Sequence, residues 1–200
     1  GPVPPSADAA VEVFDGPPPE QAVRRAAVLV ALFEEAGEAR VVLTRRSTTL
    51  RSHRGEVSFP GGGVDPGEDA VAAATREAFE EVALDPAAVR PVGWLRPVLT
   101  FVTNRQVTPV VAVLDRPPDA LVPSPTEVER AFDVALADLV ADGAYHEERW
   151  IFPGHVGHGS ADGSYPVRFF DVAGEIVWGA TGRLLYELAC IALGVEPADI

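Results

Sequence analysis

The sequence contains no lysine and no methionine, and its only cysteine is Cys190. One cysteine cannot form a disulfide within the chain, which excludes the disulfide-stapled secreted proteins and favours a reducing compartment. All sixteen basic side chains are therefore arginines, against thirty acidic ones, for a formal charge of -14. Nucleic acids are held mainly by basic surfaces, so this charge argues against a nucleic-acid binder. Because the start methionine is missing, we interpret Gly1-Pro2 as a remnant of tag cleavage.

Long apolar runs are absent as well. No stretch approaches the roughly 18 apolar residues of a membrane span, and no basic segment followed by an apolar one opens the chain. We therefore expect neither a membrane span nor a secretory signal, and together with the lone cysteine this predicts a cytoplasmic protein. Apolar residues still make up 47% of the 200 residues, which is enough for one domain with a sizeable core. Cys190 is expected to fill part of that core.

The order of apolar and turn-forming segments predicts a mixed α/β fold. Residues 1–22 are proline-rich and are expected to form an extended arm, and residues 23–200 are expected to form the domain. The apolar segments predict buried strands over 26–33, 39–44 and 107–114, an amphipathic helix over 69–82 and a closing helix over 182–193. Pro109 should place the third strand at a sheet edge or at a bulge. Residues 116–125 and 155–164 are expected to be loops, and 127–140 is ambiguous between strand and helix.

The most informative feature is a set of three glutamates, Glu77, Glu80 and Glu81, on the predicted helix over 69–82. Residues at i, i+3 and i+4 share one helical face, so their carboxylates are expected to form one oxygen-rich patch. Mg²⁺ and Mn²⁺ prefer such oxygen ligands. The alternative is a solvated acidic face on which Arg76 pairs with Glu80.

The spacing around these glutamates favours the metal site. Gly62 is followed after five residues by Glu68 and after seven more by Arg76-Glu77-Ala78-Phe79-Glu80-Glu81-Val82-Ala83-Leu84. This segment closely resembles the Nudix box of the Nudix hydrolases, with Ala83 replacing the family's glycine. That glycine would suit a left-handed helix ending, so alanine there costs about 1 kcal/mol or requires a different ending.

A second motif lies immediately upstream. It consists of Val42-Leu43-Thr44-Arg45-Arg46-Ser47, then Arg51, Gly55 and Phe59-Pro60-Gly61-Gly62. It resembles the additional signature of the coenzyme A diphosphatase branch of the family, and only its first leucine is exchanged, for valine. The arginines suit phosphate binding, because the planar guanidinium makes bidentate contacts with phosphate oxygens.

The resemblance covers most of residues 25–193 and implies a Nudix-type α/β/α sandwich with a central mixed sheet. It implies Mg²⁺- or Mn²⁺-dependent hydrolysis of coenzyme A to 3',5'-ADP and 4'-phosphopantetheine. Homodimers are frequent in the family, so a homodimer is expected by analogy alone. The implied metal ligands are Glu77, Glu81, Glu80 and the Gly62 carbonyl; the implied substrate-binding residues are Arg46, Arg51, Arg54, Gly61 and Gly62.

The remaining roles are less sharply defined. Arg76 is expected to orient the glutamates by charge-assisted hydrogen bonds. The general base is open between Glu77, Glu68 and Glu127, and Glu127 is also a candidate for an extra metal ligand. His155 and His158 are interpreted as residues of a solvated loop, because no cysteine lies nearby to complete a zinc site.

Two other functions stay open. The first is a Nudix hydrolase of another nucleoside diphosphate derivative, such as NADH or ADP-ribose, because the box does not reveal what the diphosphate joins. The second is a non-catalytic Nudix-like domain that binds a ligand and regulates a partner. Such a domain would be free to lose its carboxylates, and here all four glutamates of the box are present.

Overall fold

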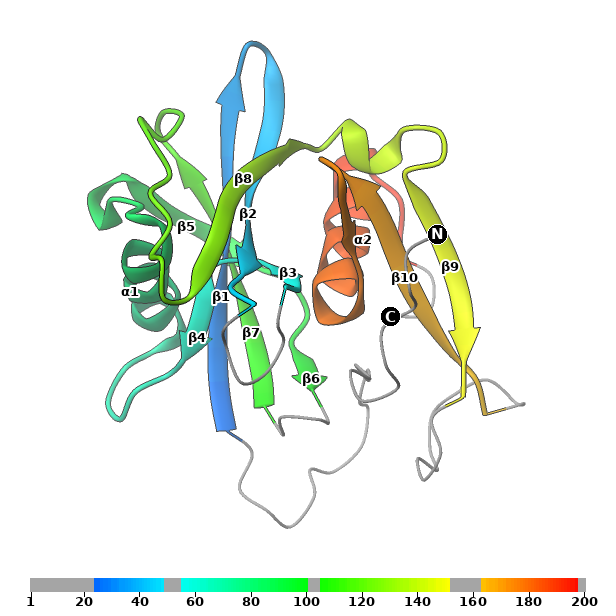
Figure 1. Cartoon of the computed structure of the whole chain (residues 1–200), viewed down its shortest axis with the longest axis horizontal. Helices are drawn as coiled ribbons and strands as arrows, with labels where there is room; N and C mark the ends of the chain where they lie inside the picture. The colour runs from blue at the N-terminus through cyan, green and yellow to red at the C-terminus, as the bar shows by residue number, and fades with distance from the viewer. Residues whose placement is uncertain (1–23, 49–54, 101–104, 152–162, 198–200) are drawn as a thin grey trace.

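A computed structural model describes residues 24–48, 55–100, 105–151 and 163–197 of the chain. Its main element is a mixed sheet of eight strands, in which β1 runs parallel to β7 and the other pairs are antiparallel (Figure 1). The central order is β3-β2-β1-β7-β5, with β8 added beside β2, β4 beside β1 and β6 beside β7. The strands are β1 (Arg24–Glu35), β2 (Glu38–Arg46), β3 (Val57–Ser58), β4 (Gly61–Gly63), β5 (Val89–Trp94), β6 (Val98–Thr100), β7 (Arg105–Leu114) and β8 (Val128–Ala135).

Two helices cover opposite faces of this sheet. Helix α1 (Ala70–Val82) packs its buried alanines and Val82 against one side of β1 and β7, in a cluster that includes Leu29 and Val110. Helix α2 (Gly179–Leu193) packs Leu185 against the other side, in a second cluster that includes Val30. Each helix buries an apolar stripe against the sheet, which confirms the predicted α/β/α sandwich with a mixed central sheet.

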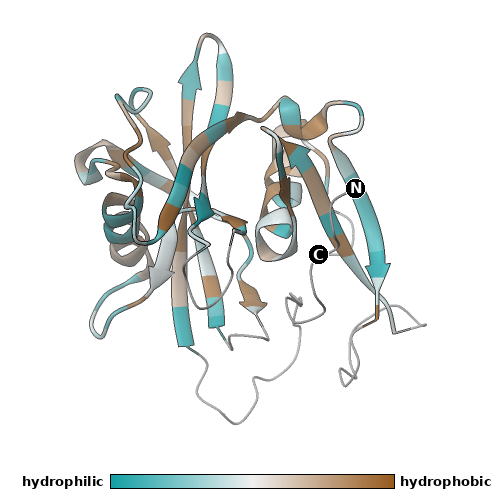
Figure 2. Cartoon of the chain, viewed as in Figure 1, coloured by the Kyte–Doolittle hydropathy of each residue, from teal (hydrophilic) through white to brown (hydrophobic). Residues whose placement is uncertain are grey.

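A small second sheet, which the sequence analysis did not predict, follows the large one. It consists of β9 (Tyr145–Trp150), β10 (Tyr165–Val172) and β11 (Glu175–Val177) in the order β11-β10-β9. Phe170 of β10 shares a buried cluster with α2 and the large sheet. In Figure 1 α2 therefore lies between the two sheets, and Figure 2 shows mainly hydrophilic residues along β9 at the outer edge.

The predicted elements are largely found. The strands expected over 26–33 and 39–44 are β1 and β2, which form an antiparallel hairpin around the turn at Ala36 and Gly37. Residues 116–125 contain no helix or strand, and the ambiguous segment 127–140 contains β8 followed by a short 3-10 helix, η3 (Asp138–Val140). A second 3-10 helix, η2 (Pro86–Ala88), follows α1. No helix in the described residues has the length and apolar composition that a membrane span requires.

The predicted edge position of Pro109 is wrong, because β7 has neighbours on both sides. Proline lacks the N–H that a ladder hydrogen bond needs. On the side facing β5 and β6, however, Pro109 lies where the partner strand changes. Val107 pairs with Val98 of β6, and Val110 pairs with Trp94 of β5. An interior strand therefore accepts proline at the junction between two short neighbours.

The ends of α1 are fixed by local hydrogen bonds. Asp69 is the N-cap, and its side chain accepts a hydrogen bond from the Ala72 N–H at 2.8 Å. At the other end Ala83 has φ 57° and ψ 30°, the left-handed conformation that usually falls to glycine. Alanine thus keeps the ordinary ending of the helix rather than replacing it.

We expect Ala83→Gly to stabilise the protein by about 0.5–1 kcal/mol, because glycine adopts the left-handed conformation without the steric cost that alanine carries. Chemical denaturation of both proteins measures the change. Ala87→Gly is the matched control, because Ala87 is equally exposed in the adjoining η2 and has no positive φ. It should destabilise or leave stability unchanged, and a loss of stability in Ala83→Gly would contradict the proposed strain.

Candidate active site

The site is organised around a buried carboxylate, that of Glu81 in the last turn of α1. Its side chain is 3% exposed. The Gly61 N–H donates a hydrogen bond to Glu81 Oε2 at 3.1 Å, and Arg46 Nη1 lies 3.6 Å from Oε1. The backbone carbonyl of Glu81 accepts from the Ser124 N–H at 2.8 Å. Four segments far apart in the sequence therefore meet at one residue.

Burial sets the protonation of this carboxylate. It raises the pKa of Glu81 to about 7, and the negative charges of Glu77 and Glu127 act in the same direction. The Gly61 N–H and Arg46 oppose this shift of the pKa without cancelling it. Burial also raises the pKa of Glu77, against the attraction of Arg76.

Arg76 holds most of the remaining carboxylates. Its Nε and Nη2 each donate to one oxygen of Glu68 at 3.0 Å, a bidentate pair. Its Nη1 donates to Glu77 at 3.1 Å and to Glu80 at 3.2 Å. The pKa of Glu68 is lowered by these bonds with Arg76 and by the Asp65 N–H. The ion pair between Arg76 and Glu80, which the alternative of a solvated acidic helix face predicts, is therefore present, but as part of a larger network.

The glycine run allows the chain to approach α1 closely. A Cβ atom on Gly62 would lie 2.4 Å from the carboxylate carbon of Glu77, and one on Gly61 would lie 2.4 Å from the carbonyl oxygen of Ala27. Any side chain at either position would thus displace β4 or the glutamate. Gly63, which the sequence analysis did not select, accepts a hydrogen bond from Arg76 Nη2 at 3.0 Å through its carbonyl. The only feature of the sequence that points to Gly63 is its place as the third consecutive glycine.

The other predicted site residues are placed only in part. Arg46 ends β2, beside Glu81, and the backbone carbonyl of Glu127 accepts from the Ser47 N–H at 2.8 Å, just before β8 begins. Glu127 is exposed, and its charge acts on both Glu77 and Glu81. Arg51, Arg54, His155 and His158 lie outside the described residues, as does the arm expected over residues 1–22.

The three glutamates of α1 have different partners, although Glu77 and Glu80 meet at one nitrogen of Arg76. Glu81 turns inward to Gly61, whereas Glu77 and Glu80 turn to Arg76. Within the described ranges no three acidic, histidine or cysteine side chains lie close enough together to hold a metal ion. The donors themselves suit a hard divalent cation, because Glu77 lies against the Gly62 backbone and all are oxygens.

Comparison with known proteins identifies the family. The model of the NUDIX domain matches residues 23–153. This chain belongs to the Nudix hydrolase family. Its relatives include the uncharacterized Nudix hydrolase NudL of Escherichia coli K12, 41% identical over 176 residues, a match that covers 87% of this chain and 85% of NudL.

A plant relative and a solved structure agree with this assignment. The chloroplastic Nudix hydrolase 22 of Arabidopsis thaliana is 38% identical over 184 residues, which cover 88% of this chain and 58% of that protein. This Nudix chain thus spans about three fifths of the plant relative's length. The crystal structure of RenU, a Nudix hydrolase from M. smegmatis, is 26% identical with a TM-score of 0.51 and covers 60% of this chain and 74% of RenU.

The raised pKa of Glu81 has a consequence for stability. A carboxyl group whose pKa is higher in the folded state than its usual 4.5 stabilises the fold when protonated, so stability should fall as the pH rises from about 4.5 to about 7. We expect Glu81→Gln, in the presence of a chelator, to be more stable than the natural sequence at pH 8 by on the order of 1–3 kcal/mol. This advantage should vanish below about pH 4.5, since Glu81 is then protonated in both states.

Urea denaturation at a series of pH values measures this difference. Glu80→Gln is the control, because the Glu80 side chain is 56% exposed and its substitution relieves little burial of charge. A Glu81→Gln variant that is less stable at pH 8 than the natural sequence would show that the contacts of Glu81 outweigh its burial.

Proposed function

We propose that this protein hydrolyses the diphosphate bond of coenzyme A to give 3',5'-ADP and 4'-phosphopantetheine, with coenzyme A thioesters as further candidate substrates. The observation that carries the proposal is the contact between Arg46 and Glu81, 3.6 Å apart. Arg46 belongs to the motif that resembles the coenzyme A diphosphatase signature, and Glu81 belongs to the Nudix box. Gly61, the residue before the last one of the coenzyme A motif, also binds Glu81. The two motifs therefore meet in one site.

The roles of the residues follow from their positions. Arg46 carries a positive charge at the edge of the glutamate cluster, where it suits a substrate phosphate. Arg51 follows it in the same motif, and Arg54 directly precedes the motif's Gly55. Arg76 keeps Glu77 and Glu80 oriented and is itself held by Glu68. Glu68 is a poor general base, because both its oxygens accept from Arg76. Water is then activated by Glu77 or Glu127.

Nudix hydrolases generally use divalent ions such as Mg²⁺ or Mn²⁺. In this chain Glu77, Glu81, Glu80 and the Gly62 carbonyl would hold such ions. A bound divalent ion neutralises the phosphate oxygens and lowers the pKa of the attacking water. Glu77 and Glu80 both accept hydrogen bonds from Arg76 Nη1 in the structure, so loading the site requires one or both to exchange that partner.

Further proposals concern the whole chain. We propose that residues 23–200 form one hydrolase domain behind an arm of residues 1–22, since α2 and β10 share a buried cluster with the large sheet. We also propose a homodimer in the cytoplasm; the single free cysteine, Cys190, is buried and suits a reducing compartment.

Incubation with coenzyme A and Mn²⁺ should yield both products, identified by mass spectrometry. The same assay with NADH and ADP-ribose measures the preference, and we expect coenzyme A to have the highest kcat/KM. Cleavage of another member of the panel without cleavage of coenzyme A would replace the proposed substrate while keeping the hydrolase. Cleavage of none of them, with ligand binding retained, would favour the non-catalytic regulator.

Two substitutions separate the metal site from the substrate site. Glu81→Gln should lower kcat at least about 100-fold, because it removes a charged ligand that the reaction needs. Arg46→Gln should raise the KM for coenzyme A about tenfold with a smaller change in kcat, since it removes a charged contact to phosphate. Arg116→Gln is the control, because Arg116 pairs with nearby Asp119 on the exposed loop before β8. Unchanged activity in Glu81→Gln would end the metal-site assignment.

A further inference from the structure

Two arginines face each other near the end of the ladder between β2 and β8. Arg45 of β2 and Arg130 of β8 are directly paired in the antiparallel register. Side chains of directly opposite residues emerge on the same face of a sheet, about 5 Å apart at their Cβ atoms, and like charges in such a pair destabilise the ladder. This end of the ladder therefore needs a counter-ion.

Glu175 of β11 supplies it from the second sheet. Arg45 Nη1 donates to both carboxylate oxygens of Glu175 at 3.3 Å, and Arg130 Nη1 donates to Glu175 Oε1 at 3.2 Å. The Glu175 side chain is 10% exposed. Glu129 also lies 3.7 Å from Arg45, but its side chain is 48% exposed. Glu175 is thus the better shielded anion and the one that bridges both arginines.

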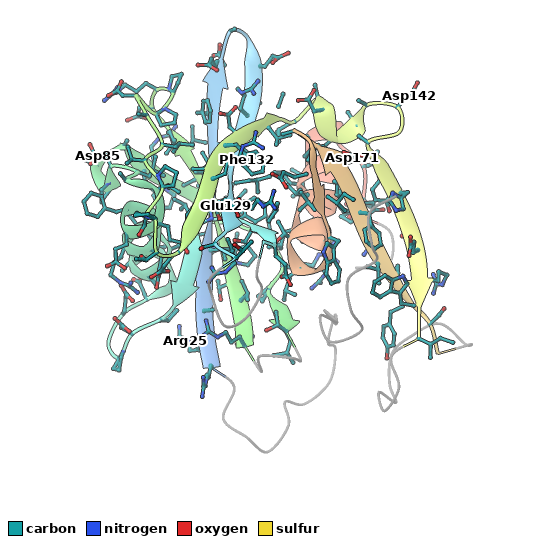
Figure 3. The ribbon with its side chains drawn as sticks, in the orientation of Figure 1. Arg25, Asp85, Glu129, Phe132, Asp142 and Asp171 are labelled. Atoms are coloured by element: carbon teal, nitrogen blue, oxygen red, sulfur yellow. The ribbon has the colours of Figure 1, made fainter. Side chains whose placement is uncertain are left out.

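Two candidate site residues, Arg46 and Glu127, lie immediately beyond this bridge. The register shifts between Arg45 and Arg46, so that Arg46 pairs with Val128 and Glu129 is the extra residue of a β-bulge. Bulges redirect the side chains next to them. Figure 3 shows Glu129 on β8, near where β2 leads into β3. Beyond the bulge, the Ser47 N–H binds the Glu127 carbonyl at 2.8 Å.

The alternation of side chains along β2 explains why adjacent Arg45 and Arg46 contact different glutamates. Successive side chains of a strand point to opposite faces. Arg45 accordingly reaches Glu175 in the second sheet, and Arg46 reaches Glu81 of α1, which covers the other face. Fixing Arg45 thus fixes the peptide that presents Arg46.

We propose that Glu175 is a positioning residue that, by bridging Arg45 and Arg130, holds the end of the β2–β8 ladder so that Arg46 stays beside Glu81. The bridge itself depends only on the contacts described, and its effect on substrate binding rests on the function proposed above. Removing the carboxylate leaves two arginines opposed at the last regular pair before the bulge. The repulsion separates β2 from β8 where both lead into the site.

Glu175→Gln tests this role in two independent ways. We expect hydrogen exchange in peptides spanning residues 43–48 and 127–131 to rise about fivefold, because the opposed charges favour local opening. We also expect the KM for coenzyme A to rise about fivefold with kcat changed less than twofold, because Arg46 acts in binding. Glu175→Asp should retain part of both properties. The double variant Glu175→Gln, Arg130→Gln restores the charge balance and should recover most of the exchange protection.

Glu187→Gln is the matched control. Glu187 is also buried and joins α2 to the large sheet through Arg96, between β5 and β6. It should lower the melting temperature without changing KM or exchange at 43–48. If Glu175→Gln behaves like Glu187→Gln, or if the double variant recovers nothing, the proposed role is wrong. The exchange measurement needs no substrate, so failure to cleave coenzyme A would not decide it.

Discussion

The buried carboxylate of Glu81 is the interaction on which the rest of the site depends. Placing a carboxylate in a position with 3% exposure is costly unless hydrogen bonds and positive charge compensate it. Here the compensation comes from the Gly61 N–H of β4 and from Arg46 of β2. Each of these partners is held by the sheet, so α1, β2 and β4 share one arrangement. These partners compensate the burial only in part, because burial still raises the pKa of Glu81.

The exclusive use of arginine fits this arrangement. Arg76 contacts three glutamates and the Gly63 carbonyl with one guanidinium, and Glu175 joins two further arginines across two sheets. A planar fork with five donors bridges several acceptors, whereas an ammonium group offers a single point of charge. In a chain with a formal charge of -14, such bridging lets few cations organise many carboxylates. The carboxylates near the site are therefore ordered by arginine as well as by the helix.

The sequence was sufficient for the elements with a strong period, and the two motifs that it contains do lie together, with Arg46 3.6 Å from Glu81. The hairpin of β1 and β2, the box helix and the closing helix were all predicted, because each carries an apolar pattern of its own. The different partners of the three glutamates were not predicted, since helical spacing places side chains on a face but does not reveal that Glu81 binds the Gly61 N–H while Glu77 and Glu80 share Arg76. The interior position of Pro109 depends on where β5 ends and β6 begins, which is a property of the neighbours.

The second sheet could not be predicted either, because it too depends on its neighbours in the fold. β9 is polar and β11 has only three residues, while β10 packs Phe170 and Val172 against α2 and the large sheet, so the second sheet depends on this packing rather than on a pattern of its own. The NUDIX domain match ends at residue 153, so β10, β11 and α2 lie beyond the part that defines the family. Glu175 comes from this later segment and contacts the strand that carries Arg46. This later segment, which follows the matched domain in the sequence, is thus tied by one carboxylate to the two strands whose ends lie beside the candidate site.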